Sequence, residues 1–249
     1  MTAGPGPESP AAAGGLLLEV FPDAEGAGRA AAARIAREAA AAVRERGRFL
    51  LALSGGRSPG PLLRALARAA LPWPQVHLFQ ADERAAPEGD PERNWTQICD
   101  ELLDALGAAG PRLHPMPADE ADLAAAAARY GRELEAVAGR PPVLDLVQLG
   151  LGADGHTASL VPGDAALACL DAPVAATGPW RGQRRITLSY PTLACARRVL
   201  WLVTGAEKRD ALRRLRAADA SIPAGRVARG RALVFADAAA AGAAEPGAA

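Results

Sequence analysis

Short apolar runs alternate with longer stretches of helical composition along most of this chain. The runs span residues 16–21, 49–53, 76–79, 144–149, 186–188, 199–203 and 232–235, with a short extended piece at 113–116. The helical stretches span residues 23–46, 61–70, 94–106, 119–137 and 207–218. Apolar strands that lack polar alternation are typical of parallel sheets buried on both faces. The pattern therefore predicts an α/β fold, with a mainly parallel, Rossmann-like sheet covered by helices on both faces.

The length of 249 residues suits one large α/β domain. We expect that domain to span residues 14–239, with flexible tails at 1–13 and 240–249. No internal repeat or linker interrupts the alternation of strands and helices.

Polar clusters follow four of the predicted strands, at the point where each strand ends. They are Ser54–Ser58, Asp82–Arg84, Asp154–His156, and Thr204–Gly205 with Lys208 one helical turn later. Ligands of open parallel sheets bind beyond the carboxyl ends of the strands. We therefore expect these clusters to converge on one cleft.

His156 is the candidate catalytic base. Asp154 lies two residues before it, and glycines at 150, 152 and 155 free the surrounding backbone. A neutral imidazole is a suitable base near neutral pH, and a neighbouring carboxylate can orient it. The other histidines are interpreted differently: His77 as a structural residue of a strand, and His114 as a residue without a polar companion. We expect His156 to activate a water molecule.

The segment Ser54–Ser58 is the candidate phosphate site. Its backbone N–H groups, its hydroxyls and a cationic side chain precede a predicted helix, as in many anion sites. It lacks the Gly-Lys-Ser/Thr signature of an ATP-binding loop, which favours a phosphorylated small molecule. Lys208 would add a cation to the same phosphate, and Arg84 would bind phosphate or stabilise an oxyanion. The predicted substrate contacts are Ser54, Gly55, Gly56, Arg57, Ser58, Asp82, Gly152 and Lys208.

Two cofactor classes are disfavoured by local context. Gly150, Gly152 and Gly155 satisfy a dinucleotide fingerprint, but Val161–Gly163 breaks the chain before the required helix. An Asp-x-His pair without a third clustered ligand is not a metal site. We expect no metal and no cofactor.

Charge and apolar patterning limit the partners. Lys plus Arg and Asp plus Glu each total 28, so no charge excess indicates nucleic acid or an anionic membrane. No apolar run reaches the roughly 18 residues of a spanning helix, and residues 1–15 lack the features of a signal peptide. The cysteines are three in number and form no Cys-x-x-Cys pair. We expect a cytoplasmic monomer or weak homo-oligomer that acts on a small molecule.

At these motifs the chain resembles the 6-phosphogluconolactonase family. That family shares a wider fold with glucosamine-6-phosphate deaminases, ribose-5-phosphate isomerases and CoA transferases. The resemblance covers roughly residues 16–237, and its most specific part is Asp154–Leu160. It implies cofactor-free hydrolysis of 6-phospho-D-glucono-1,5-lactone to 6-phospho-D-gluconate in the oxidative pentose phosphate pathway. It also implies catalytic roles for His156, Asp154 and Arg84.

Two alternatives and two departures accompany this resemblance. The alternatives are a glucosamine-6-phosphate deaminase or sugar-phosphate isomerase, and a non-catalytic sugar-phosphate-binding protein. Deaminases carry a glutamate that aligns with Val161 when His156 and the following proline are matched, and valine cannot titrate. The departures are Arg57, where a small residue is usual, and Arg93, where a serine is usual. Both departures affect the expected contacts with the phosphate group of the substrate.

Overall fold

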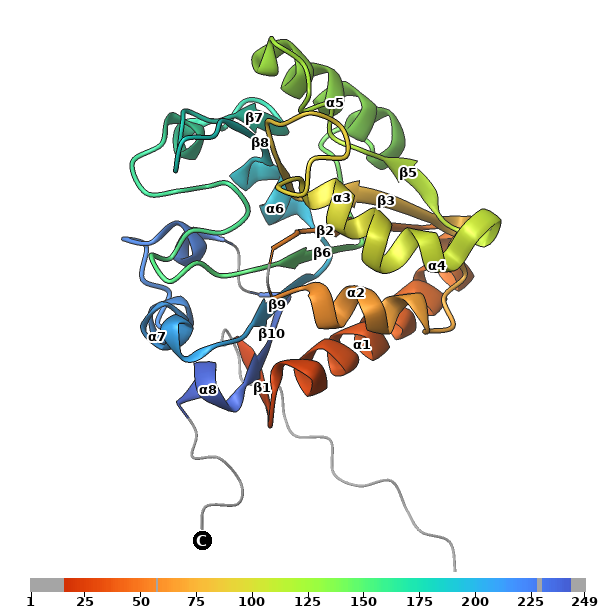
Figure 1. Ribbon diagram of the computed structural model, residues 1–249, viewed down its shortest axis with the longest axis vertical. Helices are drawn as coiled ribbons and strands as arrows, with labels where there is room; N and C mark the ends of the chain where they lie inside the picture. The colour runs from red at the N-terminus through yellow and green to blue at the C-terminus, as the bar shows by residue number, and fades with distance from the viewer. Residues whose placement is uncertain (1–15, 57, 228–229, 243–249) are drawn as a thin grey trace, which may run out of the picture.

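A parallel sheet of seven strands forms the centre of the protein (Figure 1). The computed structural model describes residues 16–56, 58–227 and 230–242. In spatial order the strands are β1 (Leu17–Phe21), β10 (Ala232–Asp237), β9 (Val199–Val203), β6 (Leu146–Leu149), β2 (Phe49–Leu53), β3 (Val76–Gln80) and β5 (Arg112–His114). All neighbouring pairs in this sheet are parallel. The predicted α/β class and mainly parallel sheet are confirmed.

Helices cover both faces of this sheet. Helices α1 (Ala24–Arg46), α2 (Gly60–Ala67) and α3 (Asn94–Ile98) pack on one face, whereas α5 (Leu123–Ala138), α6 (Tyr190–Cys195) and α7 (Arg209–Arg216) pack on the other. Strand β2 shows why its run is continuously apolar. Phe49, Leu51 and Leu53 point into the core beneath α1 and α2, while Leu50 and Ala52 point into the core on the opposite face.

Helix α1 begins and ends at residues that suit those positions. The Asp23 carboxylate accepts a hydrogen bond from Gly26 N at 2.6 Å, which satisfies one of the free N–H groups of the first turn. The helix ends at Gly47, whose φ of 73° lies in the left-handed region that favours glycine.

A second, smaller sheet lies beside α5 (Figure 1). It contains three antiparallel strands in the order β4 (Asp82–Arg84), β8 (Arg185–Leu188) and β7 (Val174–Ala176). Only the strand at 186–188 was predicted, and the polar cluster Asp82–Arg84 proves to be a strand in its own right. Strands this short carry too few residues for an alternating pattern to stand out in the sequence.

The order in which strands are added to the large sheet reverses between β2 and β6. Strands β2, β3 and β5 follow one another to one side, and β6, β9 and β10 then fill the other side. The junction between β2 and β6 has two register pairs, Leu51 with Leu146 and Ala52 with Val147, fewer than any other junction of the sheet. The Leu50 N–H also donates to Asp145 Oδ2 at 2.9 Å. Ligands of open α/β sheets bind beyond such a reversal point.

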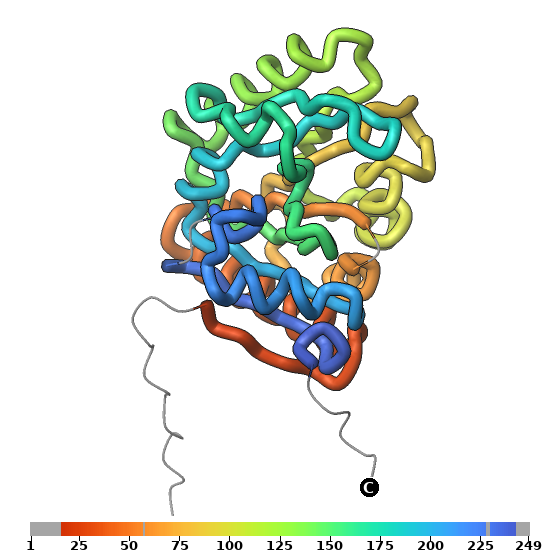
Figure 2. The backbone as a smooth tube through the Cα atoms, turned by 90° about the vertical axis from the view of Figure 1, so that its left-hand side faces the viewer, coloured from red at the N-terminus to blue at the C-terminus, as the bar shows by residue number. Residues whose placement is uncertain are grey.

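Several predicted boundaries need correction. The predicted helix at 94–106 is interrupted by a π-helical turn at Cys99–Leu103, before a last turn, α4 (Asp104–Leu106). Helix α8 (Ala238–Ala241) is capped by Asp237, and Ala240 is buried, so the folded chain continues past the predicted boundary at 239. Both described ends lie away from α5 (Figures 1 and 2). The rest of the predicted tails lies outside the described residues.

The prediction that His114 has no polar companion is wrong. Its Nε2 lies 3.0 Å from Nδ1 of His77, and its Nδ1 lies 2.6 Å from Oε1 of Glu133. Partial burial, and then the neighbouring His114, lower the pKa of His77 to about 4. These histidines lie on β3 and β5, and neither lines the cleft described below.

A membrane-spanning helix is absent from the part of the chain that the structure describes, because no helix there is both long and apolar enough.

Candidate active site

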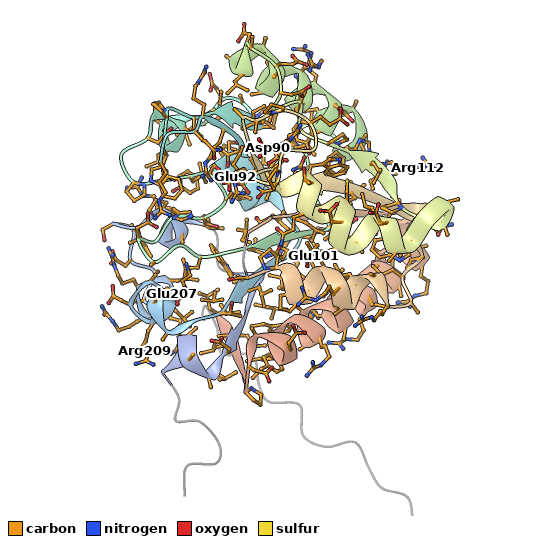
Figure 3. The ribbon with its side chains drawn as sticks, in the orientation of Figure 1. Asp90, Glu92, Glu101, Arg112, Glu207 and Arg209 are labelled. Carbon is orange, nitrogen blue, oxygen red and sulfur yellow. The ribbon has the colours of Figure 1, made fainter. Side chains whose placement is uncertain are left out.

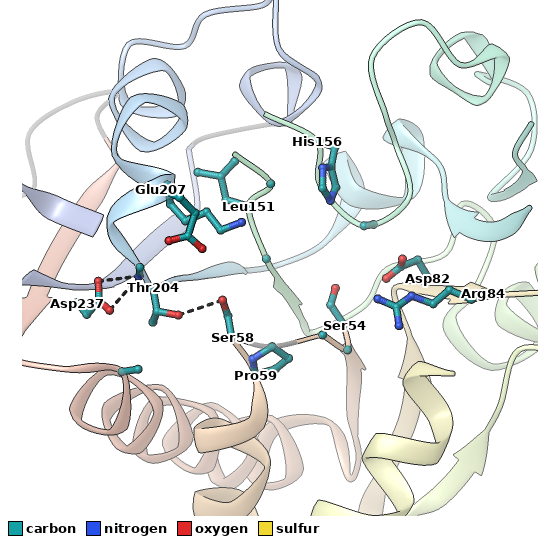
Figure 4. Close-up of a pocket in the computed structure, with 18 of the residues that line it drawn as sticks. Ser54, Ser58, Pro59, Asp82, Arg84, Leu151, His156, Thr204, Glu207 and Asp237 are labelled. Atoms are coloured by element: carbon teal, nitrogen blue, oxygen red, sulfur yellow. Dashed lines mark hydrogen bonds between the residues drawn. The ribbon is translucent and has the colours of Figure 1, made fainter. Parts of the chain in front are cut away.

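A cleft of about 390 Å³ opens at the carboxyl ends of the central strands (Figure 4). Residues from all four predicted clusters line it, so they converge as the topology predicted. The predicted site residues that line it are Ser54, Gly55, Gly56, Ser58, Asp82, Arg84, Gly152, His156 and Lys208. Asp154 is not among the lining residues and is joined to the cleft through His156. Arg57 lies outside the described residues.

The imidazole of His156 is held by Asp154. Its Nδ1 lies 2.5 Å from Oδ1 of Asp154, and the same oxygen accepts the backbone N–H of His156 at 3.2 Å. The hydrogen bond to the imidazole, more than the opposing effect of burial, lowers the pKa of Asp154 from 3.8 to about 2. The carboxylate is therefore ionised near neutral pH and can only accept hydrogen bonds. Nδ1 of a neutral imidazole must then carry the proton, which leaves the Nε2 lone pair available.

Glycine is required beside this pair. A Cβ at Gly152 would overlap Nδ1 and Cε1 of His156 and Oδ1 of Asp154. Gly152 N also donates to the carbonyl oxygen of His156 at 2.8 Å, which closes the turn on itself. Gly155 has a φ of 83°, and a Cβ there would collide with Ile222. The glycines thus let the backbone approach the pair of Asp154 and His156 closely.

The Ser54–Ser58 segment is built differently from the expected backbone cradle. The N–H of Gly56 donates to Gln97 Oε1 at 2.9 Å, and the N–H of Ser54 donates to Gln148 Oε1 at 3.2 Å. These two N–H groups are therefore engaged within the protein. The hydroxyl of Thr204 instead donates to Ser58 Oγ at 3.0 Å (Figure 4), which places two hydroxyls together at one end of the cleft.

The three residues of the Asp82–Arg84 cluster have separate roles. Asp82 and Arg84 line the cleft, and Asp82 Oδ2 accepts a hydrogen bond from the Ser159 hydroxyl at 2.6 Å. Glu83 is completely buried. Its carboxylate accepts the N–H groups of Asn94 at 2.7 Å and of Trp95 at 2.8 Å. Glu83 therefore fixes the start of α3 and does not face the cleft.

The family of this chain can be established by comparison. The family model described as glucosamine-6-phosphate isomerases/6-phosphogluconolactonase matches residues 22–235. The chain belongs to this family. The match spans the whole interval from the residue after β1 to the middle of β10, so it includes all four clusters of the cleft.

Several proteins to which the chain is similar are 6-phosphogluconolactonases. The chain is 43% identical over 175 residues to a 6-phosphogluconolactonase of Synechocystis sp., covering 69% of this chain and 72% of that protein. It is 39% identical over 206 residues to a 6-phosphogluconolactonase of Mycobacterium tuberculosis, covering 78% and 83%. The crystal structure of a 6-phosphogluconolactonase from Thermotoga maritima superposes with a TM-score of 0.79 at 27% identity, covering 89% of this chain and 99% of that one.

One departure from the family pattern now has a structural explanation. Arg93, which stands where a serine is usual, is 5% exposed. Its Nε lies 3.4 Å from Oε2 of Glu83, and its Nη2 donates to the carbonyl oxygen of Met116 at 3.0 Å. The arginine thus compensates the buried Glu83 charge. The other departure, Arg57, is not among the described residues.

Sequence reasoning missed several side chains at the cleft. Arg185, Glu207 (Figures 3 and 4) and Asp237 line it. Trp180 is not among the lining residues but packs against the ring of His156 with centroids 4.7 Å apart. Arg185 ends the polar run 181–185 and directly precedes a predicted strand, and Trp180 precedes that run. Neither follows the carboxyl end of a predicted strand, where the candidate site residues were sought. Among the described residues, no group of three or more His, Cys, Asp or Glu side chains is placed to hold a metal ion.

Proposed function

We propose that this chain hydrolyses 6-phospho-D-glucono-1,5-lactone to 6-phospho-D-gluconate, with His156 as the base that activates water. The bond between Asp154 and His156 carries this proposal, because it leaves Nε2 of the imidazole as a proton acceptor beside the cleft. Membership of the family and the similarity to 6-phosphogluconolactonases support the choice of substrate.

The proposed binding mode places the two ends of the substrate at two ends of the cleft. The phosphate is held by the hydroxyls of Ser58 and Thr204 and by the cation of Lys208. The lactone carbonyl carbon, C1, then lies near His156. Ser54, Gly55, Gly56, Asp82 and Gly152 complete the lining around the sugar.

The reaction proceeds in two steps. His156 Nε2 takes a proton from water as the water oxygen bonds to C1, and the carbonyl π pair moves onto the exocyclic oxygen. That pair then returns, the bond between C1 and the ring oxygen breaks, and the imidazolium gives its proton to the ring oxygen. The resulting carboxylic acid ionises and releases one proton. General base catalysis of this kind contributes roughly 10²–10⁴-fold, and the reaction consumes only water.

The deaminase alternative lacks a group that its chemistry uses. The glutamate of the deaminase pattern aligns with Val161, which is 3% exposed and packed in the core. A valine at this position cannot support the histidine during ring opening. The assembled pair of Asp154 and His156 favours a catalytic protein over a non-catalytic binder.

The proposal extends to the setting of the enzyme. We propose one domain acting in the cytoplasm as a monomer or weak homo-oligomer, without metal or cofactor. The small-molecule substrate and the balanced charge of the chain support this setting.

The decisive experiment replaces the base. His156→Ala should lower kcat by about 10³-fold or more while KM changes only a few-fold, because the imidazole acts in the chemical step. His77→Ala removes a histidine outside the cleft and is the matched control, with kcat expected to stay unchanged. The assay follows fresh lactone with a dehydrogenase that oxidises the product, corrected for spontaneous hydrolysis. Undiminished turnover by His156→Ala would refute the assignment of the base.

The phosphate end is tested separately. Lys208→Ala should raise KM about tenfold or more and leave kcat within a few-fold, because a group that holds the phosphate binds ground state and transition state alike. The same coupled assay provides both constants. A fall in kcat at constant KM would contradict the placement of the phosphate.

A further inference from the structure

Two arginines face each other across the small sheet. Arg84 of β4 and Arg185 of β8 are register partners in an antiparallel pair. Like charges directly opposite each other destabilise a sheet unless something compensates them. In each of these side chains the buried Nε has no hydrogen-bond partner within the described part of the chain. Both residues also line the cleft.

Arg185 is the more deeply buried of the two. Arg185 is 7% exposed. Its Nη1 lies 3.5 Å from Oγ of Ser159, at the outer limit of a hydrogen bond. A guanidinium has five N–H groups, and a buried cation is costly when they lack acceptors. Burial lowers the pKa of Arg185 below its ordinary value, against the opposing effect of the Asp82 carboxylate. Arg84 differs, because its Nη1 donates to the carbonyl oxygen of Glu92 at 2.6 Å.

Trp180 places the guanidinium beside the catalytic base. Its ring centroid lies 4.7 Å from Cζ of Arg185, and the same ring lies 4.7 Å from the imidazole of His156 in an edge-on arrangement at 63°. One indole therefore contacts both the base and the arginine, which fixes their relative position.

This arginine pair lies away from the proposed phosphate position. In Figure 4, Arg84 and Asp82 lie on one side of Ser54, and the linked hydroxyls of Ser58 and Thr204 lie on the other. The register of the small sheet places Arg185 with Arg84. An anion between these guanidinium groups is therefore not the phosphate but negative charge at the reacting end of the substrate.

We propose that Arg185 is a catalytic residue that donates hydrogen bonds to the exocyclic oxygen on C1 of the lactone. The assignment rests on the proposed function. This oxygen gains the carbonyl π pair when water adds to C1, and it becomes part of the product carboxylate when the bond to the ring oxygen breaks. A fixed, water-shielded donor aimed at that charge stabilises the tetrahedral intermediate. Arg185 also stabilises the bound product.

The test compares two ligands that share a phosphate. 6-Phospho-D-gluconate carries a carboxylate at C1, and D-glucitol 6-phosphate carries a hydroxymethyl group there. Isothermal titration calorimetry measures both affinities, and the coupled assay measures kcat and KM. The variants are Arg185→Met and Arg185→Lys, which keeps the buried charge. Arg181→Met is the matched control, because the exposed Arg181 also stacks on the Trp180 ring, at 4.4 Å.

The expected result is selective. Arg185→Met should lower kcat by about 10²–10³-fold, the usual cost of removing one oxyanion donor, with KM changed only a few-fold. Its Kd for 6-phospho-D-gluconate should rise about tenfold or more, and its Kd for D-glucitol 6-phosphate should stay within about twofold. Arg185→Lys should show the same selectivity to a smaller extent, because a point charge replaces a fork of donors. The control should change none of these values by more than about twofold.

Two results would overturn the assignment. Equal loss of affinity for both ligands in Arg185→Lys would assign this side chain to the phosphate, and a retained kcat in Arg185→Met would remove it from the chemical step. The wild-type protein separates this failure from that of the proposed function. If the wild-type protein hydrolyses the lactone and one of these two results is found, the role of Arg185 is rejected and the proposed function stands. If the wild-type protein has no lactonase activity, the proposed function and the role of Arg185 are both rejected.

Discussion

Adding one methyl group at Gly152 should disable the enzyme without unfolding it. Gly152 has no positive φ, so alanine is compatible with its backbone. The new Cβ would nevertheless lie inside the 3.0 Å limit that real Cβ atoms respect, against two imidazole atoms of His156 and the carboxylate of Asp154. The clash falls on the proposed catalytic pair, Asp154 and His156, which must move to relieve it.

The size of the effect follows from that movement. Ordinary contact begins at 3.4 Å, so the imidazole must withdraw by on the order of 1 Å. A misplacement of about 1 Å in a reacting group costs roughly 10²-fold in rate, or about 2.7 kcal/mol of transition-state stabilisation. The proposed phosphate contacts at Ser58 and Lys208 come from other loops and should persist. We therefore expect Gly152→Ala to lower kcat about 10²-fold and to leave KM within a few-fold.

The coupled lactonase assay, together with thermal unfolding, checks this prediction. Gly150→Ala is the control within the same turn, because no atom lies within 4 Å of its added Cβ. Gly150 also borders the cleft, so this control is judged on kcat, which should stay within a few-fold. Normal kcat in a folded Gly152→Ala protein would refute the close packing of glycine against His156. A lost folding transition would show that the methyl group damages the turn itself.

Three further predictions concern other contacts. Glu83→Gln leaves the Arg93 cation buried and unpaired, and should cost roughly 3–5 kcal/mol and lower the unfolding midpoint by about 6–20 °C in calorimetry. Asp154→Asn should lower kcat roughly 10²–10⁴-fold; because the pKa of Asp154 is lowered to about 2, its effect is complete above about pH 4 and is lost only as pH falls toward 2. The comparison of kcat between wild type and Asp154→Asn at pH 7 checks this role, and equal kcat values in the two proteins would contradict it. Trp180→Ala should lower kcat/KM about tenfold in steady-state kinetics and Trp180→Phe far less, and equal losses would show that the ring is not used for stacking.

The parallel sheet could be predicted because its signal is local. Each central strand buries both faces, as Phe49–Leu53 shows, so its run is apolar without interruption and ends at a polar cluster. The small antiparallel sheet could not be predicted in the same way. Asp82–Arg84 is polar and Val174–Ala176 is three residues long, and both are strands only because Arg185–Leu188 pairs with them.

The same contrast between local and long-range contacts applies to the candidate site. His156 and Asp154 are neighbours in the sequence, so their pairing was visible there. Arg185 meets Arg84 from a hundred positions away in the chain, and Trp180 reaches the imidazole through a separate turn. Glu83 shows the same limit, because the long-range hydrogen bonds that make it a buried anchor cannot be seen in the sequence. A charged side chain can be recognised in the sequence, but the distant residues that it binds in the folded protein cannot.

The short ladder between β2 and β6, which has two register pairs, lies between the two sides of the cleft. His156, the proposed base, follows β6, and the segment with Ser54 and Ser58 follows β2. The two sides of the candidate active site are therefore carried by the two neighbouring strands with the fewest register pairs. Side chains fasten both ends of that ladder, Asp145 to Leu50 N and Gln148 to Ser54 N. Substitutions at Asp145 or Gln148 would remove hydrogen bonds between these two strands without changing a residue that lines the cleft.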